Sequence, residues 1–438
     1  MKSNFDWVKY QKLEPEKIRA LTLAFDVKRI FAMGLMPVRG PKGFRKLDYE
    51  FAERTLNVNK IMDKLEINHF NVFGLVIKDT DGACMWNTKF GWNPIERDIL
   101  GEFCDAGKDR NIKIMASFTS MNDAYQGVIH PERVSIHGTT GKKSGIIYKK
   151  GEISTHYESE MRIDLPDGIS IKEYKKKVPF LTEMIDEKKG KARGARGEGY
   201  IPTTSFMCPN SKHVDYLLDL TKEVIKNYPV KGFFADYIRY DGAFTDLCCC
   251  DRCQEKFRKK FGPKAKLLKS SEWYDFKSDT IAEYAQKLQT VIKRTNQKCT
   301  SGWFCLPGPK KMFSQKRLGQ DWMKLSSILD VASPMEYPYL MGTRDDGCYW
   351  RKVADFFYWY FMRNMKKRIH EFQSPVLAVT NSVECNTEEM LKQIKGFNFG
   401  LGIAVFKYFG TTDAQWIALK KYAEEEIGLE NLFSTKLN

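Results

Sequence analysis

Two acidic side chains of this 438-residue sequence follow apolar stretches and could do chemistry as a pair. Asp236 ends the run GFFAD at 232–236, and Glu336 follows SPM at 333–335. A carboxylate is costly to bury unless it has a partner or a purpose, and two facing carboxylates can share the work of cleaving a glycosidic bond. We expect Asp236 to act as nucleophile or base, and Glu336 as general acid with a pKa raised by apolar neighbours. A structural carboxylate paired with Arg239 is the alternative for Asp236.

Other polar and aromatic residues stand at similar positions, at or near the ends of apolar stretches. Tyr237 and Arg239 could orient Asp236. Aromatic rings could cover the apolar face of a sugar ring. The alternative is that about half of these rings are ordinary core or rim residues. The candidate substrate-binding residues are Asp79, Asp81, Asn210, Tyr237, Arg239, Trp303, Tyr337, Asn381 and Lys407, and the further rings are Trp86, Trp92 and Tyr339. These residues predict a carbohydrate substrate.

The elements that must position these residues alternate along the chain. Short stretches rich in Val, Ile and Phe predict eight strands, at residues 29–36, 70–77, 112–118, 230–238, 298–305, 328–335, 375–380 and 402–408. Helical patterns stand at 49–65, 94–111, 212–227, 272–296 and 412–427. Buried strands separated by helices, without a Gly-rich dinucleotide-binding turn after the first, favour an α/β fold of the (β/α)8 TIM-barrel type over a doubly wound sheet. The C-terminal ends of such strands meet at one mouth, where active sites form.

Two segments interrupt the regular spacing. Residues 122–207 form a large insertion after the third strand, and residues 241–270 form a cysteine-rich loop after the fourth. Both leave from strand ends at the expected mouth, where long loops are usually lids or small subdomains. We therefore expect residues 1–438 to form a single decorated barrel, with the insertion subdomain and the cysteine-rich loop within it.

The cysteines of the second segment have the spacing of metal ligands. Cys248, Cys250 and Cys253 form C-x-C-x-x-C, and Cys208 is the candidate fourth ligand of a tetrahedral structural zinc site. A redox pair of Cys250 and Cys253, or reduced thiols without metal, are the alternatives. The six histidines show no ligand spacing, so we expect no cofactor for catalysis.

Three segments resemble the glycoside-hydrolase-like TIM barrels, a group of glycosidases and alpha-amylase-family proteins. CPN at 208–210, a helix, and YPVKGFFADYIRYDG at 228–242 are similar to that group's CPN…DYIR block. The cysteine spacing and LDVASPMEY at 329–337 are similar to its C-x-C-x-x-C and D-x-x-x-P-M-x-Y motifs. The resemblance implies a glycosidase-type site in which Asp236 ends strand four as nucleophile and Glu336 ends strand six as acid/base. A similar cysteine cluster holds zinc in some beta-galactosidase barrels of the cytosolic type.

Charge and composition bound the remaining classes. The 71 Lys and Arg against 55 Asp and Glu give a formal charge of +16, but the lysines are spread along the chain. This favours a solvated surface, with a nucleic-acid-binding protein as the rival. A charged N-terminus and the lack of any membrane-length apolar stretch predict a cytoplasmic protein that works without a membrane. A catalytically inactive carbohydrate-binding barrel, a transferase or lyase, and a homo-oligomer all stay open.

Overall fold

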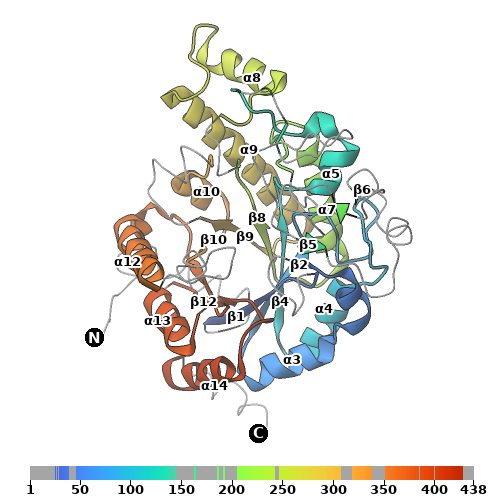
Figure 1. Cartoon of the computed structure of the whole chain (residues 1–438), viewed down its shortest axis with the longest axis vertical. Coiled ribbons are helices and arrows are strands. Elements are labelled where there is room, and N and C mark those ends of the chain that lie inside the picture. The colour runs from blue at the N-terminus through green and yellow to red at the C-terminus, as the bar shows by residue number, and fades with distance from the viewer. Residues whose placement is uncertain are drawn as a thin grey trace.

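Eight parallel strands form a nearly closed barrel in the computed structural model, which confirms the predicted fold class (Figure 1). The structure describes residues 25, 27, 29–38, 46–139, 141, 143–144, 162–163, 185–186, 191–192, 205–241, 246–306, 318–337, 351–383, 385–398 and 400–427. The barrel strands are β1 (Ile30–Leu35), β3 (Val72–Lys78), β4 (Lys113–Thr119), β8 (Gly232–Asp236), β9 (Thr300–Cys305), β10 (Val331–Pro334), β11 (Leu377–Asn381) and β12 (Gly402–Phe406). Their order is β10-β9-β8-β4-β3-β1-β12-β11, and the parallel bridges Ala332–Val376 and Met335–Val379 bring β10 against β11.

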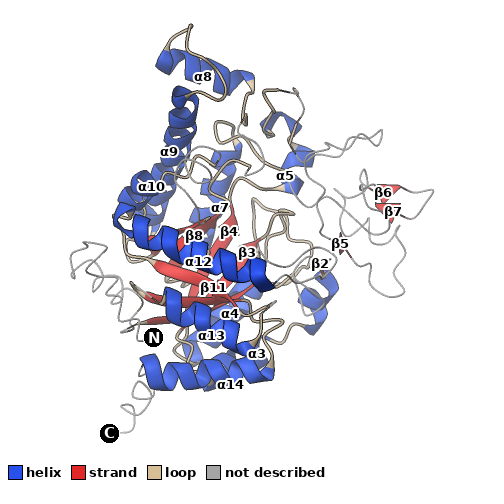
Figure 2. Cartoon of the chain, turned by 60° about the vertical axis from the view of Figure 1, so that its left-hand side comes forward, coloured by secondary structure: helices blue, strands red, loops and turns tan. Residues whose placement is uncertain are grey.

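Helices surround the strands on the outside of the barrel (Figure 2). The longer ones are α3 (Val58–Ile67), α4 (Ile99–Asp109), α7 (His213–Asn227), α8 (Asp251–Phe261), α9 (Ser271–Thr295), α10 (Trp322–Ile328), α12 (Arg351–Arg368), α13 (Thr387–Phe397) and α14 (Asp413–Tyr422). Short elements are β2 (Lys46–Leu47), η1 (Phe51–Thr55), α5 (Ala124–Ile129), η2 (Pro131–Arg133), β5 (Arg162–Ile163), β6 (Ile185–Asp186), β7 (Lys191–Ala192), η5 (Ile369–Glu371) and η6 (Ala423–Ile427).

Side-chain caps set where two of these helices begin, and here the structure differs from the sequence prediction. The helix predicted over 49–65 is split into the π-helical turn η1 and α3, because the Asn57 side chain accepts the N–H of Lys60 and starts a new helix. The helix predicted from residue 94 begins only at Ile99, where Asp98 accepts the N–H of Gly101 at 2.9 Å. A capping residue inside a periodic stretch thus moves the boundary that periodicity alone suggests.

Alternation along the strands sorts the apolar side chains into two layers. Met115 and Phe234 belong to the cluster inside the barrel, whereas Phe118 and Phe233 pack in the layer between strands and helices. Gly302 makes room for the interior ring of Phe234, since a Cβ there would lie 2.2 Å from the Cε1 atom of that ring. The odd or even position of a residue along its strand therefore decides whether its side chain faces the barrel interior.

The two predicted interruptions follow β4 and β8. Most of the insertion 122–207 lies outside the described residues, as does Tyr339, and the division into domains stays a prediction. The cysteine-rich loop leads into α8, which projects with the start of α9 beyond the barrel (Figures 1 and 2). Among the described helices, none combines the length and the apolar character that crossing a bilayer requires.

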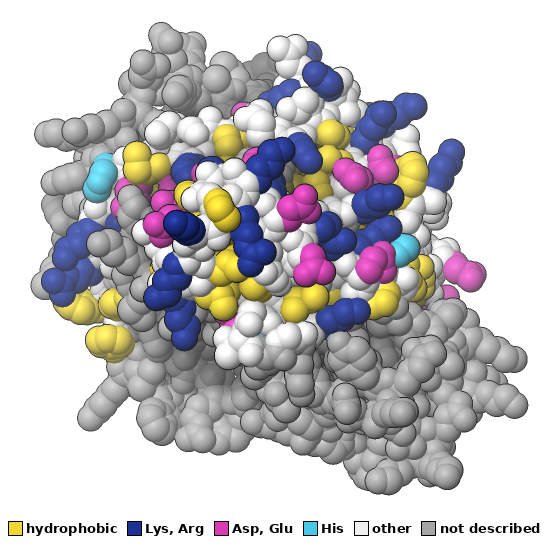
Figure 3. Space-filling model, turned by 90° about the horizontal axis from the view of Figure 1, so that it is seen from above, with side chains coloured by type: hydrophobic (Ala, Val, Ile, Leu, Met, Phe, Trp, Pro, Cys, Tyr) yellow, Lys and Arg dark blue, Asp and Glu magenta, His cyan; other side chains and the backbone are white. Residues whose placement is uncertain are grey.

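Charged side chains of both signs are interspersed over the described part of the face seen in Figure 3. Ion pairs of this kind join α8, α9 and α10, where Lys260 and Lys324 both contact Asp279. Exposed pairs contribute only about 0–1 kcal/mol each. They mark a solvated surface and do little to hold the helices in place.

Candidate active site

A cavity of about 280 Å³ lies inside the C-terminal half of the barrel. Asp236, the last residue of β8, and Asp79, the residue after β3, both line it. Tyr237, Arg239 and Tyr337 are the other candidate residues that the structure brings to its wall. The rest of the wall is largely apolar and includes Met33, Met115, Phe304, Met335 and Phe406. An apolar pocket of roughly 300 Å³ with a few polar groups is typical of small-molecule sites.

Asp236 is held by the backbone on both sides. Its carbonyl oxygen accepts the N–H of Ser120 at 2.7 Å, and its Oδ1 accepts the N–H of Tyr237 at 2.6 Å. Tyr237 has a φ of +47°, a left-handed conformation that is uncommon for a residue with a large side chain. The tight turn after β8 thus fixes the carboxylate at the cavity wall.

Two neighbours set the electrostatics around Asp236. The guanidinium carbon of Arg239 lies 4.2 Å from the ring centroid of Tyr237. A positive charge therefore lies close to the turn that follows Asp236. Burial raises the pKa of the Tyr337 hydroxyl well above its ordinary value, and the negative charge of Asp236 raises it further. Tyr337 therefore stays protonated and can donate a hydrogen bond inside the cavity.

Glu336, two residues after the end of β10, does not line the cavity. The side chains before and after it, Met335 and Tyr337, line the cavity, whereas Glu336 is absent from the described lining and is fully buried. Neither of its carboxylate oxygens has a hydrogen-bond partner among the described residues. Burial raises its pKa to about 8. The raised pKa matches what a general acid needs, but the position does not face Asp236 across the cavity.

The remaining candidate residues within the described part of the chain do not line the cavity. Asp81 accepts a hydrogen bond from the Tyr49 hydroxyl, and Asn381 donates from Nδ2 to the Val383 carbonyl at 2.5 Å. Trp303 is buried in the layer behind β9, with its ring centroid 6.4 Å from that of Phe372. Lys407 is buried directly after β12, and Asn210 lies beside the cysteines. The indole N–H of Trp86 donates to the Glu223 carboxylate at 2.9 Å. The ring of Trp92 stacks on that of Tyr125, with centroids 5.2 Å apart.

Sequence reasoning missed Thr80, Ser117 and Thr119, which also line the cavity. A signal for the last two was present, since they alternate with Met115 along one strand and therefore share its interior face. Their hydroxyl groups are among the few polar groups of the wall and can bind the hydroxyl groups of a ligand.

Sequence reasoning also missed a buried ion pair next to the cavity. The Nζ of Lys78 lies 2.9 Å from Asp123 Oδ2 and donates to the Thr119 carbonyl at 3.0 Å, and both charged side chains are fully buried. Asp123 also caps α5 through Oδ1, which accepts the N–H of Gln126 at 2.9 Å. Nearby, burial lowers the pKa of His213 to about 4, and its Nε2 lies 2.9 Å from the Ser120 carbonyl oxygen. This group ties the ends of β3 and β4 together.

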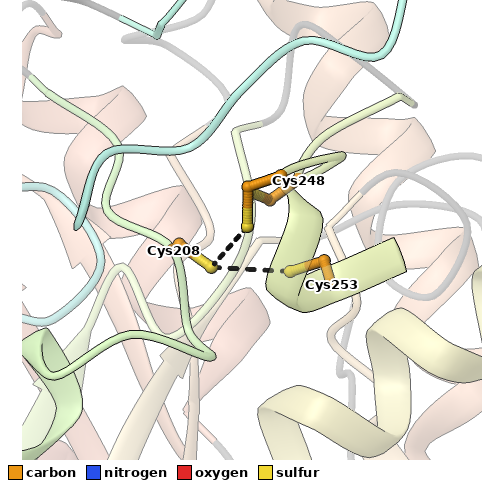
Figure 4. A group of neighbouring side chains, drawn as sticks. Cys208, Cys248 and Cys253 are labelled. Carbon is orange, nitrogen blue, oxygen red and sulfur yellow. Dashed lines mark hydrogen bonds between the residues drawn. The ribbon is translucent and has the colours of Figure 1, made fainter. Parts of the chain in front are cut away.

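The four predicted cysteines form a closed cluster between the loop before α7 and the start of α8. Figure 4 shows three of them, Cys208, Cys248 and Cys253, pointing toward one another. Their sulfur atoms all lie within 4.8 Å of one another, and Cys208 Sγ is 3.6 Å from Cys250 and 3.5 Å from Cys253. Zinc–sulfur bonds of about 2.3 Å in a tetrahedron require sulfur atoms about 3.8 Å apart. The donor set therefore fits a zinc ion, and Cys249 is not part of it.

Two donors outside the cluster approach its sulfur atoms. The N–H of Ile136 donates to Cys248 Sγ at 3.4 Å, and Asn210 Nδ2 donates to Cys253 Sγ at 3.2 Å. Hydrogen bonds from Cys208, Cys248 and Cys253 hold the pKa of Cys250 well below its ordinary value. Such donors favour thiolate sulfur, which is the form that binds a metal.

Together these features define a (β/α)8 barrel with a candidate small-molecule site at its C-terminal mouth and a cysteine cluster beside it. No protein-family model matches the sequence, and no curated protein matches it in sequence.

The fold is similar to that of glycoside hydrolases among the solved structures. One is an alpha-L-fucosidase isoenzyme 2 from Paenibacillus thiaminolyticus, with a TM-score of 0.55 and 13% identity, covering 92% of this chain and 50% of that chain. Another is a beta-galactosidase from the haloarchaeon Halorubrum lacusprofundi, with a TM-score of 0.55 and 10% identity over 90% of this chain and 57% of that chain. A beta-galactosidase from Marinomonas ef1 has a TM-score of 0.53 and 10% identity, covering 92% of this chain and 61% of that chain. This chain thus spans 50–61% of these enzymes, and the likeness is one of fold.

Proposed function

We propose that this protein hydrolyses glycosidic bonds and that Asp236 is its nucleophile or base. The observation that carries the proposal is the position of Asp236, fixed by a strained turn at the end of a barrel strand and facing a cavity at the mouth. Active sites of such barrels lie at this end of the strands. The fold shared with fucosidases and beta-galactosidases supports a glycosidic bond as the target, so α-L-fucosides and β-D-galactosides are the first substrates to test.

The surroundings of Asp236 suit an ionised carboxylate. The Tyr237 N–H donates to its Oδ1, and the cation of Arg239 stands over the Tyr237 ring. An anion in this place can attack the anomeric carbon or take a proton from an attacking water, and it stabilises the positive charge that develops on the sugar ring.

The cavity wall suits one sugar ring. The rings of Tyr337 and Phe406 stack with centroids 6.0 Å apart and, together with Tyr237 and Phe304, offer apolar faces. Thr80, Ser117 and Thr119 on the same wall offer hydroxyl groups. The apolar rings suit the C–H faces of a pyranose ring, and the hydroxyl groups of the wall suit the hydroxyl groups at its edge.

The variant Asp236→Asn tests the proposal. It keeps an oxygen that can accept the Tyr237 N–H, so the fold is retained, but it has no nucleophilic or basic carboxylate. We expect hydrolysis of nitrophenyl α-L-fucoside or β-D-galactoside to fall by at least about 10³-fold, with the thermal unfolding midpoint unchanged. Full activity in Asp236→Asn would contradict the assignment. A wild-type protein that binds these sugars without turnover would instead be a carbohydrate-binding barrel.

We also propose that Cys208, Cys248, Cys250 and Cys253 hold a structural zinc ion. The four buried sulfur atoms within 4.8 Å of one another support it. Bound zinc would keep the loop before α7 attached to the start of α8 and leave no open position for catalysis.

Metal analysis tests the zinc proposal. We expect about one zinc per chain in the purified protein and loss of zinc with a lower unfolding midpoint in Cys250→Ser, because three sulfur ligands no longer close the tetrahedron. Cys249→Ser is the matched control and should keep the metal. Protein that contains no zinc after growth in zinc-supplemented medium would contradict the proposal.

A further inference from the structure

Two carboxylates face the cavity, although the one predicted to pair with Asp236 does not. Among the described residues of its wall, the acidic side chains are Asp79 and Asp236. Asp79 is 2% exposed, and its Oδ1 accepts the N–H of Thr80 at 2.6 Å. An acid that protonates a leaving group must reach the same substrate as the nucleophile, so it must share this cavity.

A bulge in β3 is what turns Asp79 inward. Gly74 and Val76 line the cavity, so regular alternation would place Lys78 inside and Asp79 outside. The register of β3 on β4 shifts between Val76 and Lys78: Val76 pairs with Ser117, and Lys78 pairs with the very next residue, Phe118. One extra residue in β3 therefore reverses the alternation, which is how bulges re-aim side chains at active sites.

The same register places Asp79 level with Asp236. Lys78 stands opposite Phe118, so Asp79 stands beside Thr119, and Thr119 in turn pairs with Asp236. The two acids are separated by two strand spacings, about 9.6 Å along the barrel wall. Both residues line the cavity, and the wall curves around it, so this value is an upper bound for their separation. Such a bound is compatible with the roughly 5–9.5 Å between the two carboxyl groups of glycosidases.

The bulge is held in place by the side chain that it expels. Lys78 lies outside the cavity, where its Nζ contacts Asp123 and the Thr119 carbonyl at 2.9 and 3.0 Å. Both partners belong to the end of β4 and the residues after it. The ion pair thus keeps a positive charge out of the cavity and fixes the turn that presents Asp79.

We propose that Asp79 is the proton-donating carboxylate that works with Asp236, an inference that rests on the proposed hydrolysis. The proton of the Asp79 carboxyl moves to the glycosidic oxygen while the bond from C1 to that oxygen breaks and leaves both electrons on the oxygen. Asp236 supplies the electron pair at C1, either directly or through a water whose proton it takes. Asp79 regains a proton from the water that completes hydrolysis in the first case and from solvent in the second.

Leaving-group dependence tests this role. A 2,4-dinitrophenyl glycoside departs without protonation, whereas a methyl glycoside of the same sugar needs an acid. We expect Asp79→Asn to lose about 10²–10⁴-fold in kcat/KM on the methyl glycoside and less than about tenfold on the dinitrophenyl glycoside. It should also lose the basic limb of the pH profile of kcat/KM. Asp236→Asn should lose activity on both substrates.

The controls separate this inference from the proposed function. Asp109→Asn makes the same change at the exposed end of α4 and should leave both rates unchanged. If the wild type cleaves neither glycoside, the proposed function fails and the role of Asp79 with it. If the wild type is active and Asp79→Asn keeps the methyl rate, or Glu336→Gln shows the leaving-group dependence instead, only the role of Asp79 is overturned. Should Asp79→Asn fail to fold, the same two rates in Asp79→Glu decide, since a displaced acid should again slow the methyl glycoside selectively.

Discussion

The ends of β8 and β10 look alike in the sequence but differ in the structure. Each strand finishes on an apolar run followed by a carboxylate, Asp236 or Glu336. The first faces the cavity, whereas the second is buried on the far side of its strand, between Met335 and Tyr337 that both face the cavity. Successive side chains of a strand point to opposite faces. Whether a carboxylate can act in the cavity therefore depends on its odd or even position as much as on its chemical type.

The largest expected difference between Asp236 and Glu336 is in the rate of hydrolysis when each is replaced. Because Asp236 shares the cavity wall with Tyr237 and Arg239 and Glu336 does not, Asp236→Asn should reduce hydrolysis at least about 100-fold more than Glu336→Gln. Both variants and Asp109→Asn are assayed on one aryl glycoside, with unfolding curves to show that they are folded. Equal losses of hydrolysis rate in Asp236→Asn and Glu336→Gln would mean that Glu336 also reaches the substrate. Lining the cavity would then not distinguish catalytic from other carboxylates.

The sequence predicts the strands well because buried parallel strands are nearly continuous apolar runs, and all eight lie where those runs stand. It also predicts the cysteine cluster, because three of its four cysteines are close in the chain. The direction of Asp79 could not be predicted, since the bulge at Ile77 becomes visible only in the pairing of β3 with β4. Alternation along 333–337 places Glu336 on the side opposite to Met335 and Tyr337, whereas its residue type alone suggests a place in the site.

A second effect, on stability, follows from the burial of Glu336. Its pKa of about 8 lies above the ordinary value of 4.5, so the folded state keeps a proton that the unfolded chain loses between these two pH values. The free energy of unfolding should therefore fall as the pH rises from about 4.5 to 8, by up to about 5 kcal/mol, and change no further above that. Urea unfolding at pH 5 and pH 8 measures the fall.

The variant Glu336→Gln isolates this contribution. All other titrating groups are shared with the wild type, so the difference between the two proteins reports on position 336 alone. We expect Glu336→Gln to lose less stability between pH 5 and pH 8 than the wild type does, because an amide carries no proton to lose. Parallel curves for the two proteins would show that the Glu336 carboxylate is solvated or paired when it ionises.

The smallest of the three effects contrasts Glu336 with Lys78, a second buried charged side chain that does not line the cavity. Lys78 has the partner that Glu336 lacks among the described residues, since its Nζ lies 2.9 Å from Asp123 Oδ2. Lys78→Met should therefore lower the free energy of unfolding by about 3 kcal/mol at pH 7, because it leaves Asp123 buried without its cation. The double variant Lys78→Met with Asp123→Asn should regain most of the loss, since the amide removes the unpaired charge while its oxygen can still accept the Gln126 N–H that caps α5. A Lys78→Met protein as stable as the wild type would show that the ion pair contributes little to stability and is not what holds the bulge before Asp79.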